Sequence, residues 1–345
     1  IWSGDACNWL DWSAEEQNGK WIPIHRALGP NSMNTCSGIS IYEGSSGIAL
    51  FLARLYAEGR DPIHQATLLG SAKQITGQLD ELETEANVAF YSGWPGASWA
   101  ITEIGATLGD EALIRTELTR LEKAAAFEPQ LPQTDILLGS AGLITALVDL
   151  DCKYGRRFDC SRLLEIAVRH GDFLLSSAVR SDEGWSWETI PVPVHRNLTG
   201  YAHGVSGIIC ALAELSRATG EGRFAKAVEE GLRYEQSQFS PEIGNWRDYR
   251  ADAAEANEEA YQFGWCHGAP GIGMARFRLI ELGFDSPEIR CDLDVALETT
   301  TRKLEYADAA GQRDFCICHG LAGNAELPLL VSQWSGQETR RESAD

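Results

Sequence analysis

The sequence repeats one short element six times, and this repetition constrains the fold more than any other feature of the chain. Each copy is a Gly-x-x-Gly turn that is followed directly by an apolar run with helical periodicity. Recurrence of one element along a chain is the signature of a repeat architecture. The glycine pairs, called here the first to sixth glycine turns, are Gly44-Gly47, Gly93-Gly96, Gly139-Gly142, Gly204-Gly207, Gly268-Gly271 and Gly320-Gly323.

A second set of helices is expected between these runs. Their apolar residues recur with a period near 3.6 and their charges gather on one face, which is typical of an outer helical layer. The runs that follow the glycine turns are apolar on more sides, which is typical of an inner layer. The sequence has no sustained alternation of apolar and polar residues with a period of two, so it predicts no strands. The expected outer helices span residues 64–83, 111–127, 162–179, 222–239 and 287–306.

Two helices per repeat predict an all-α fold, either an open solenoid or a closed α/α toroid, a double-layered barrel of inner and outer helices. We favour the toroid. Residues 1–40 are expected to form a lead-in segment and residues 41–345 the toroid, with a final repeat that is truncated or absent. Since the first residue is Ile1 rather than Met, the sequence is expected to be a piece of a longer protein.

Charge and composition exclude several classes of protein. A net charge of −21 argues against a nucleic-acid partner, which requires a basic surface. The apolar runs are too short for a membrane span, and no signal peptide opens the chain. We therefore expect a cytoplasmic protein. In such a protein nine cysteines indicate free thiols or metal ligands rather than a disulfide framework.

Chemically reactive residues gather in the last three glycine turns. Cys266-His267-Gly and Cys318-His319-Gly open the fifth and sixth turns, and His203-Gly opens the fourth. Thiolate and imidazole are the ligands that Zn²⁺ prefers, and in a closed ring the fifth and sixth turns are neighbours. Two cysteines and one histidine would leave the vacant fourth position of a catalytic zinc. Repeat symmetry does not choose between His267 and His319, and the alternative is that these residues merely pack at helix ends.

The motifs "IYEGSSGIALFLARLY", "AHGVSGI", "GWCHGAPGIG" and "CHGLAGNAE" resemble, in this order, those of the lanthionine synthetase C-like family. This family contains the LanC cyclases and the cyclase domain of LanM lanthipeptide synthetases, and the first motif is most similar to the LanM type. The resemblance covers about residues 40–330. It implies a zinc ion held by Cys266, Cys318 and His319.

The resemblance also implies roles for further residues. His203 matches a proposed acid/base, and Asp135 matches an aspartate ahead of the third glycine turn; without the resemblance, Asp135 reads equally well as a helix cap. His267 is a candidate catalytic residue beside a ligand. Gln262 stands where some members carry arginine, so a positive charge at that point is not expected. Cys316 is a weaker alternative ligand.

The implied reaction joins a peptide cysteine to a dehydroalanine or dehydrobutyrine and forms a lanthionine or methyllanthionine ring. Its partners would be a dehydrated precursor peptide with its leader and a dehydratase domain or subunit. Two alternatives stay open. A LanC-like protein could instead add glutathione to dehydrated proteins. A noncatalytic peptide-binding toroid could use zinc only to join two repeats, with a fourth protein ligand such as His267 or Cys316.

Overall fold

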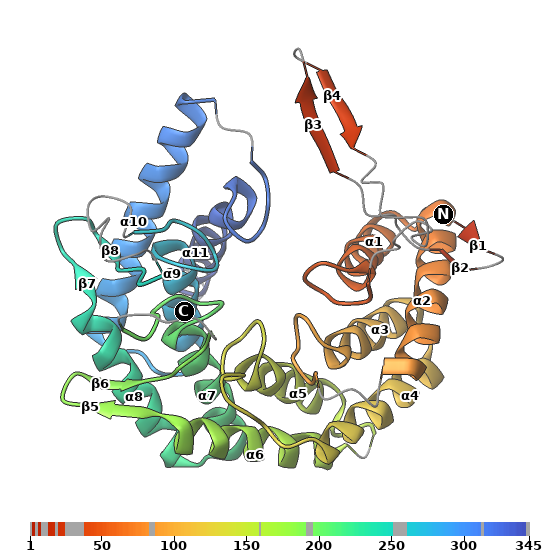
Figure 1. Cartoon of the computed structure of the whole chain (residues 1–345), viewed down its shortest axis with the longest axis horizontal. Coiled ribbons are helices and arrows are strands. Elements are labelled where there is room, and N and C mark those ends of the chain that lie inside the picture. Colours follow the sequence, from red (N-terminus) through yellow and green to blue (C-terminus); the bar gives the residue numbers. More distant parts are fainter. Residues whose placement is uncertain are drawn as a thin grey trace. The chain divides into compact units, whose positions relative to one another are not determined.

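The computed structural model describes residues 2–3, 6–7, 13–17, 20–24, 38–82, 87–158, 160–190, 196–250, 261–311 and 314–342 (Figure 1). The chain forms two compact units, Ile1–Phe127 and Glu128–Asp345. The described part is predominantly helical, and its few strands are short. Within the described ranges no helix combines the length and the apolar character that a membrane crossing needs.

Where it is described, the first unit contains the first two glycine turns and four α-helices. Inner helices α1 and α3 contact each other, while α2 packs on α1 and α4 packs on α3 (Figure 1). The helices are α1 (Ser45–Gly59), α2 (Pro62–Leu82), α3 (Trp94–Leu108) and α4 (Glu111–Leu121), which continues as the 3-10 helix η1 (Glu122–Ala126). This pairing is the predicted arrangement of inner and outer helices.

The second unit repeats the pattern, with seven α-helices among its described residues. Inner helix α7 contacts α5 and α9, and α9 contacts α11, while α6, α8 and α10 pack on the inner helix that precedes each of them. The inner helices are α5 (Ser140–Tyr154), α7 (Val205–Thr219), α9 (Ala269–Glu281) and α11 (Leu321–Glu342). The outer helices are α6 (Ser161–Ser177), α8 (Gly222–Ser237) and α10 (Pro287–Ala309).

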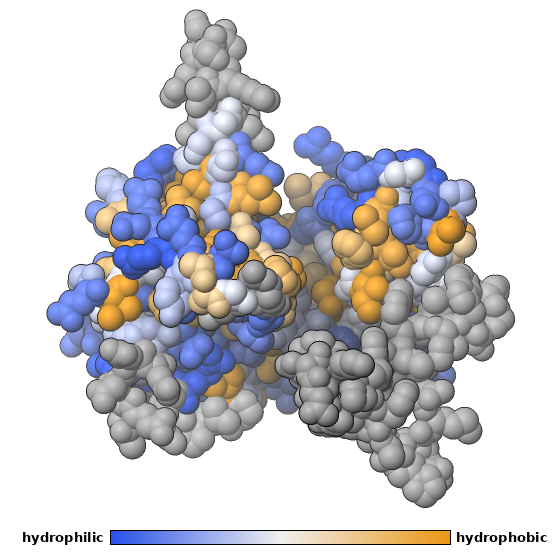
Figure 2. Space-filling model, turned by 90° about the horizontal axis from the view of Figure 1, so that it is seen from above, coloured by the Kyte–Doolittle hydropathy of each residue, from blue (hydrophilic) through white to orange (hydrophobic). Residues whose placement is uncertain are grey.

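Burial distinguishes the two layers. Every residue of α7 from 205 to 213 is buried, as expected for a helix that has neighbours on all sides. Helix α8 buries only one face, which runs through Phe224, Val228 and Gly231. Figure 2 shows hydrophilic side chains over much of the face that it draws, with smaller apolar areas between them. The periodicity of the sequence therefore gives the correct layer for both helices.

Four two-stranded antiparallel hairpins were not predicted. They are β1 (Trp2–Ser3) with β2 (Ala6–Cys7), β3 (Ser13–Gln17) with β4 (Lys20–Ile24), β5 (Val179–Ser181) with β6 (Gly184–Ser186), and β7 (Phe239–Ser240) with β8 (Asn245–Trp246). Most are too short for alternation to be recognised.

The second glycine of a turn is required because the backbone of the preceding loop passes very close to its Cα atom. A Cβ atom at Gly271 would lie 2.0 Å from the carbonyl oxygen of Trp265, and one at Gly323 would lie 1.7 Å from that of Ile317. Both distances are far below van der Waals contact. The preceding loop is therefore folded tightly over the start of each inner helix, which brings the residues before the first glycine to a fixed place.

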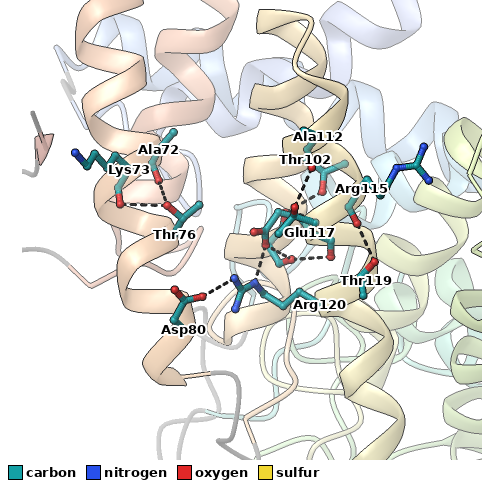
Figure 3. A network of polar contacts seen from close by, with 12 residues as sticks. Ala72, Lys73, Thr76, Asp80, Thr102, Ala112, Arg115, Glu117, Thr119 and Arg120 are labelled. Carbon is teal, nitrogen blue, oxygen red and sulfur yellow. Dashed lines mark hydrogen bonds and ion pairs between the residues drawn. The ribbon is translucent and has the colours of Figure 1, made fainter.

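A buried carboxylate joins three helices of the first unit (Figure 3). Glu117 on α4 accepts hydrogen bonds from Ser98 Oγ on α3 at 2.8 Å and from Arg120 Nε at 3.0 Å. Arg120 Nη2 also contacts Asp80 Oδ1 on α2 at 2.7 Å. Because a buried charge needs partners, this network fixes how the outer helices pack on α3.

His170 on α6 gives the second unit a stability that depends on pH. The ring is buried with Nδ1 2.9 Å from Ser140 Oγ, and burial, followed by the charge of Arg169, lowers its pKa to about 4. Between pH 6.5 and 4 the unfolded chain binds a proton at this ring that the folded chain does not. The free energy of unfolding is therefore expected to fall by up to about 3 kcal/mol across this window.

This loss is measured by urea unfolding at a series of pH values. The His170→Gln variant should show a smaller loss than the wild type between pH 6.5 and 4, because the titrating ring is gone. Equal losses in both proteins would contradict the prediction.

Candidate active site

Backbone hydrogen bonds connect equivalent residues of successive glycine turns. In the second unit, the residue two places before the first glycine bonds to its counterpart in the next turn. Leu137 N donates to Ala202 O at 3.2 Å, Ala202 N to Cys266 O at 3.1 Å, and Cys266 N to Cys318 O at 3.2 Å. The two cysteines thus become neighbours although 52 positions separate 266 from 318. The repeat itself creates the site.

Cys266, Cys318 and His319 form the cluster that the sequence predicted. One potential ligand atom from each residue lies within 4.8 Å of the others. The pKa of the Cys266 thiol is raised by its hydrogen bond with Cys318 and by burial. Two thiols and one imidazole fit the preference of zinc. His267 and Cys316 lie outside this cluster.

Two glycines allow the turns to approach each other this closely. A Cβ atom at Gly200 would lie 2.5 Å from Cys266 O and 2.6 Å from His267 Nδ1. One at Gly264 would lie 2.9 Å from the Cα atom of His319. Neither glycine belongs to a Gly-x-x-Gly pair, so the repeat pattern gave no indication of its importance.

Two asparagines that the sequence analysis missed hold the fifth turn in place. Asn245 is a buried residue of β8, and its side chain donates to Gln262 O at 3.0 Å and accepts from Ala269 N, the start of α9, at 2.8 Å. Asn324 on α11 donates to Phe263 O at 3.2 Å. These bonds fix the loop from 262 to 268 from both sides. Only the folded structure brings these residues to that loop.

His203 and Asp135 form a second polar group in the neighbouring turns. His203 Nδ1 lies 2.7 Å from Asp135 Oδ2, and Leu138 N donates to Asp135 Oδ1 at 2.6 Å. Asp135 is fully buried, whereas the His203 ring is partly exposed. Burial raises the pKa of Asp135, and the hydrogen bond with His203 opposes that effect. This arrangement fixes the orientation of the imidazole and leaves Nε2 as the nitrogen that can exchange a proton.

His267 packs against the ring of His203 and does not belong to the cysteine cluster. Its ring is 2% exposed and stacks on that of His203, with 5.9 Å between ring centroids. Burial and the nearby charge of Arg250 lower its pKa to about 3, so it is neutral at ordinary pH. The geometry makes His267 a support for His203, while its predicted catalytic role stays a prediction.

Gln262 supplies no positive charge, but Arg250, in an ion pair with Asp248, influences the cluster electrostatically. Arg250 is bound through Nη2 to the buried Asp248 at 2.7 Å, and its Nε lies 3.1 Å from each oxygen of the same carboxylate. Burial raises the pKa of Asp248, but these bonds with Arg250 contribute to an overall lowering of that pKa. The charge of Arg250 acts on both Cys266 and His267. Nothing in the local sequence around Cys266 indicated this arginine.

Replacement of Gly200 by alanine tests the close approach of the turns. The added Cβ would collide with the backbone and ring at Cys266-His267, so the variant is expected to lose about 1–3 kcal/mol of stability and to bind metal more weakly. Gly222 is the matched control, since a Cβ there meets nothing within 4 Å. Urea unfolding and zinc titration measure both effects. Equal behaviour of Gly200→Ala and Gly222→Ala would contradict the prediction.

Comparison with known proteins identifies the fold and the family. A solved structure described as nisin cyclase matches with a TM-score of 0.59 and 19% identity, over 85% of this chain and 76% of that chain. This likeness confirms the predicted all-α fold of the α/α toroid class. A family model described as lanthionine synthetase C-like protein matches residues 36–345. The chain therefore belongs to the lanthionine synthetase C-like family.

Two curated relatives support this assignment. The lacticin 481/lactococcin biosynthesis protein LcnDR2 of Lactococcus lactis subsp. lactis is 24% identical over 82% of this chain, and the match spans 28% of that protein's length. Glutathione S-transferase LANCL1 of Danio rerio is 23% identical over 84% of this chain and 68% of its own length. The family thus includes proteins of lanthipeptide biosynthesis and a protein named for glutathione transfer.

Proposed function

We propose that this protein is a zinc-dependent lanthionine cyclase, which adds peptide cysteine thiols to dehydroalanine or dehydrobutyrine residues. The single observation that carries the proposal is the cluster of Cys266, Cys318 and His319 beside the His203–Asp135 pair. The two groups stand on consecutive glycine turns, joined by the bond from Ala202 N to Cys266 O. A thiol activated at the first group would therefore react within reach of the second.

Cys266, Cys318 and His319 would hold the zinc ion. When bound, the zinc ion would make the substrate thiol acidic enough to react as a thiolate near neutral pH. Three protein ligands leave one position for the substrate, and among the described residues neither His267 nor Cys316 belongs to the cluster. This count supports a catalytic site over one in which zinc only joins two repeats.

His203 would supply the proton that completes the addition. The thiolate electron pair forms the bond from sulfur to the β-carbon, and the electrons of the former double bond move to the α-carbon and its carbonyl. The α-carbon then takes a proton from His203, which recovers one from the next substrate thiol. Asp135 keeps Nδ1 protonated and Nε2 directed outward, as a carboxylate partner does for an acid–base histidine.

The proposed substrate is a dehydrated precursor peptide with its leader, and a dehydratase domain or subunit would supply it. Similarity to LcnDR2, of which this chain matches a minor part, favours this role in a cytoplasmic biosynthetic enzyme. Addition of glutathione to dehydrated proteins is the second candidate, favoured by the similarity to LANCL1. The chemistry is the same in both, and only the source of the thiol differs.

The test is incubation of the zinc-loaded protein with a dehydrated peptide that contains cysteine. Ring formation leaves the peptide mass unchanged but removes the free thiol, so alkylation followed by mass spectrometry reports the reaction. We expect the alkylated fraction to disappear faster than without protein. The same assay with excess glutathione should give little adduct. A dominant glutathione adduct would favour the second candidate, and no reaction with either thiol would contradict both.

A further inference from the structure

His319 belongs to two groups of potential ligands. Besides its place with Cys266 and Cys318, it forms a second group with Asp314 and Cys316, whose ligand atoms also lie within 4.8 Å of one another. His319 Nε2 lies 4.0 Å from Asp314 Oδ2. The two side chains are 65% and 61% exposed, so protein packing holds the imidazole only weakly.

The Asp314 carboxylate, in contrast, is fixed by the turn. Its Oδ1 accepts a hydrogen bond from Cys316 N at 2.9 Å, and its backbone oxygen accepts one from Leu321 N, at the start of α11, at 2.7 Å. One carboxylate oxygen is thus engaged in shaping the loop. The other is directed toward His319.

A histidine that binds a metal through one ring nitrogen carries a proton on the other. Metal-binding histidines usually donate this proton to a carboxylate or a carbonyl, which fixes the tautomer and the ring orientation and makes the ligand more basic. His319 is the exposed member of the proposed zinc cluster and therefore the one that most needs such a partner. Asp314 Oδ2, at 4.0 Å from Nε2, is the carboxylate oxygen that could accept this proton.

We propose that Asp314 is a positioning residue for the metal site, which accepts the Nε2 proton of His319 and so presents Nδ1 to the two thiols. The proposal rests on the zinc site of the proposed function. In this proposal Asp314 supports His319, a ligand of that site, and the group of Asp314, Cys316 and His319 is not a second cation site. The partial engagement of the carboxylate by Cys316 N favours this interpretation.

The Asp314→Asn variant is the appropriate probe. Its side-chain oxygen can still accept from Cys316 N, so the turn is kept, but the group that then faces Nε2 is an amide NH₂, which donates. Zinc affinity, measured by competition with a chromophoric chelator, is expected to fall about 10–100-fold. Asp314→Glu, which keeps a carboxylate, should recover part of this loss. Asp294→Asn, at an exposed position of α10, is the matched control and should leave the zinc affinity unchanged.

A second measurement separates positioning from folding. In zinc-loaded protein labelled with ¹⁵N-histidine, long-range proton–nitrogen correlations should show His319 protonated at Nε2. Circular dichroism of each variant checks that the helices are retained. Unchanged affinity in Asp314→Asn, or a proton on Nδ1, would overturn the proposal while leaving the zinc site intact. Loss of a second zinc equivalent in both Asp314→Asn and Cys316→Ser would instead reveal a separate cation site. A wild-type protein that binds no zinc would refute the proposed function and this inference together.

Discussion

Replacement of Cys266 or Cys318 by alanine is expected to release the metal and to abolish ring formation. Zinc sites of this kind bind with about 10–16 kcal/mol in total, so the loss of one of three protein ligands should cost about 4 kcal/mol, or roughly 10³-fold in affinity. Because the two thiols share one hydrogen-bonded cluster, either substitution leaves only one soft ligand with His319. No other residue of the described part completes that cluster.

Metal analysis of the purified proteins measures this effect, with one zinc per chain expected in the wild type. Cys291, an exposed free thiol on α10, provides the matched control, and Cys291→Ala should retain its zinc. His267→Ala should also retain most of its zinc if His319 is the ligand. Full zinc content in both Cys266→Ala and Cys318→Ala would refute the metal site.

The fold was predictable because the repeat encodes it locally. Each glycine turn starts an inner helix and each amphipathic segment forms an outer one, so the expected helix at 222–239 corresponds to α8, Gly222–Ser237. The expected segment at 111–127 also proves helical, although it ends as the 3-10 helix η1. Such patterns depend only on residues that are close in the sequence, so they can be recognised without the tertiary structure.

The residues of the candidate site were predictable for the same reason, but the contacts between them were not. Repeat symmetry placed His267 and His319 at equivalent positions and did not choose between them, whereas the resemblance to the family favoured His319. In the structure, His319 lies with the two thiols, whereas His267 is buried against the ring of His203. That difference arises from packing around each turn. The repeat pattern of the glycine turns carries no information about such contacts.

The supporting residues escaped the sequence analysis because they reach the site over long distances in the chain. Asn245 caps α9, which starts 24 positions later, and Asn324 reaches back to the loop at Phe263. The charge of Arg250, from a separate segment, lowers the pKa of Cys266 and so partly offsets the effect of burial. Asparagine and arginine are common surface residues, so nothing but the folded geometry marks these three.

The largest effect expected without loss of metal is that of His203. If its Nε2 delivers the proton to the α-carbon, His203→Asn should keep its zinc and still bind the substrate thiol, but should form rings about 10²–10⁴-fold more slowly. Asp135→Asn should also slow the reaction, since its oxygen can keep the bond from Leu138 N while its amide NH₂ faces Nδ1 and favours the wrong tautomer. The measurement is the single-turnover rate of ring formation, with zinc content determined on the same sample. A wild-type rate in His203→Asn would remove this residue from the mechanism.

The double variant decides whether Asp135 acts through His203. Two independent contributions would multiply, whereas residues that act as one unit give a double variant no slower than the worse single variant. Asp135 is fully buried and its Oδ2 lies 2.7 Å from His203 Nδ1, so the second outcome is expected. His203→Asn and the double variant should therefore cyclise at about the same rate. A further loss in the double variant would mean that Asp135 supports the site in another way, for example through the backbone bond from Leu137 N to Ala202 O that leads toward Cys266.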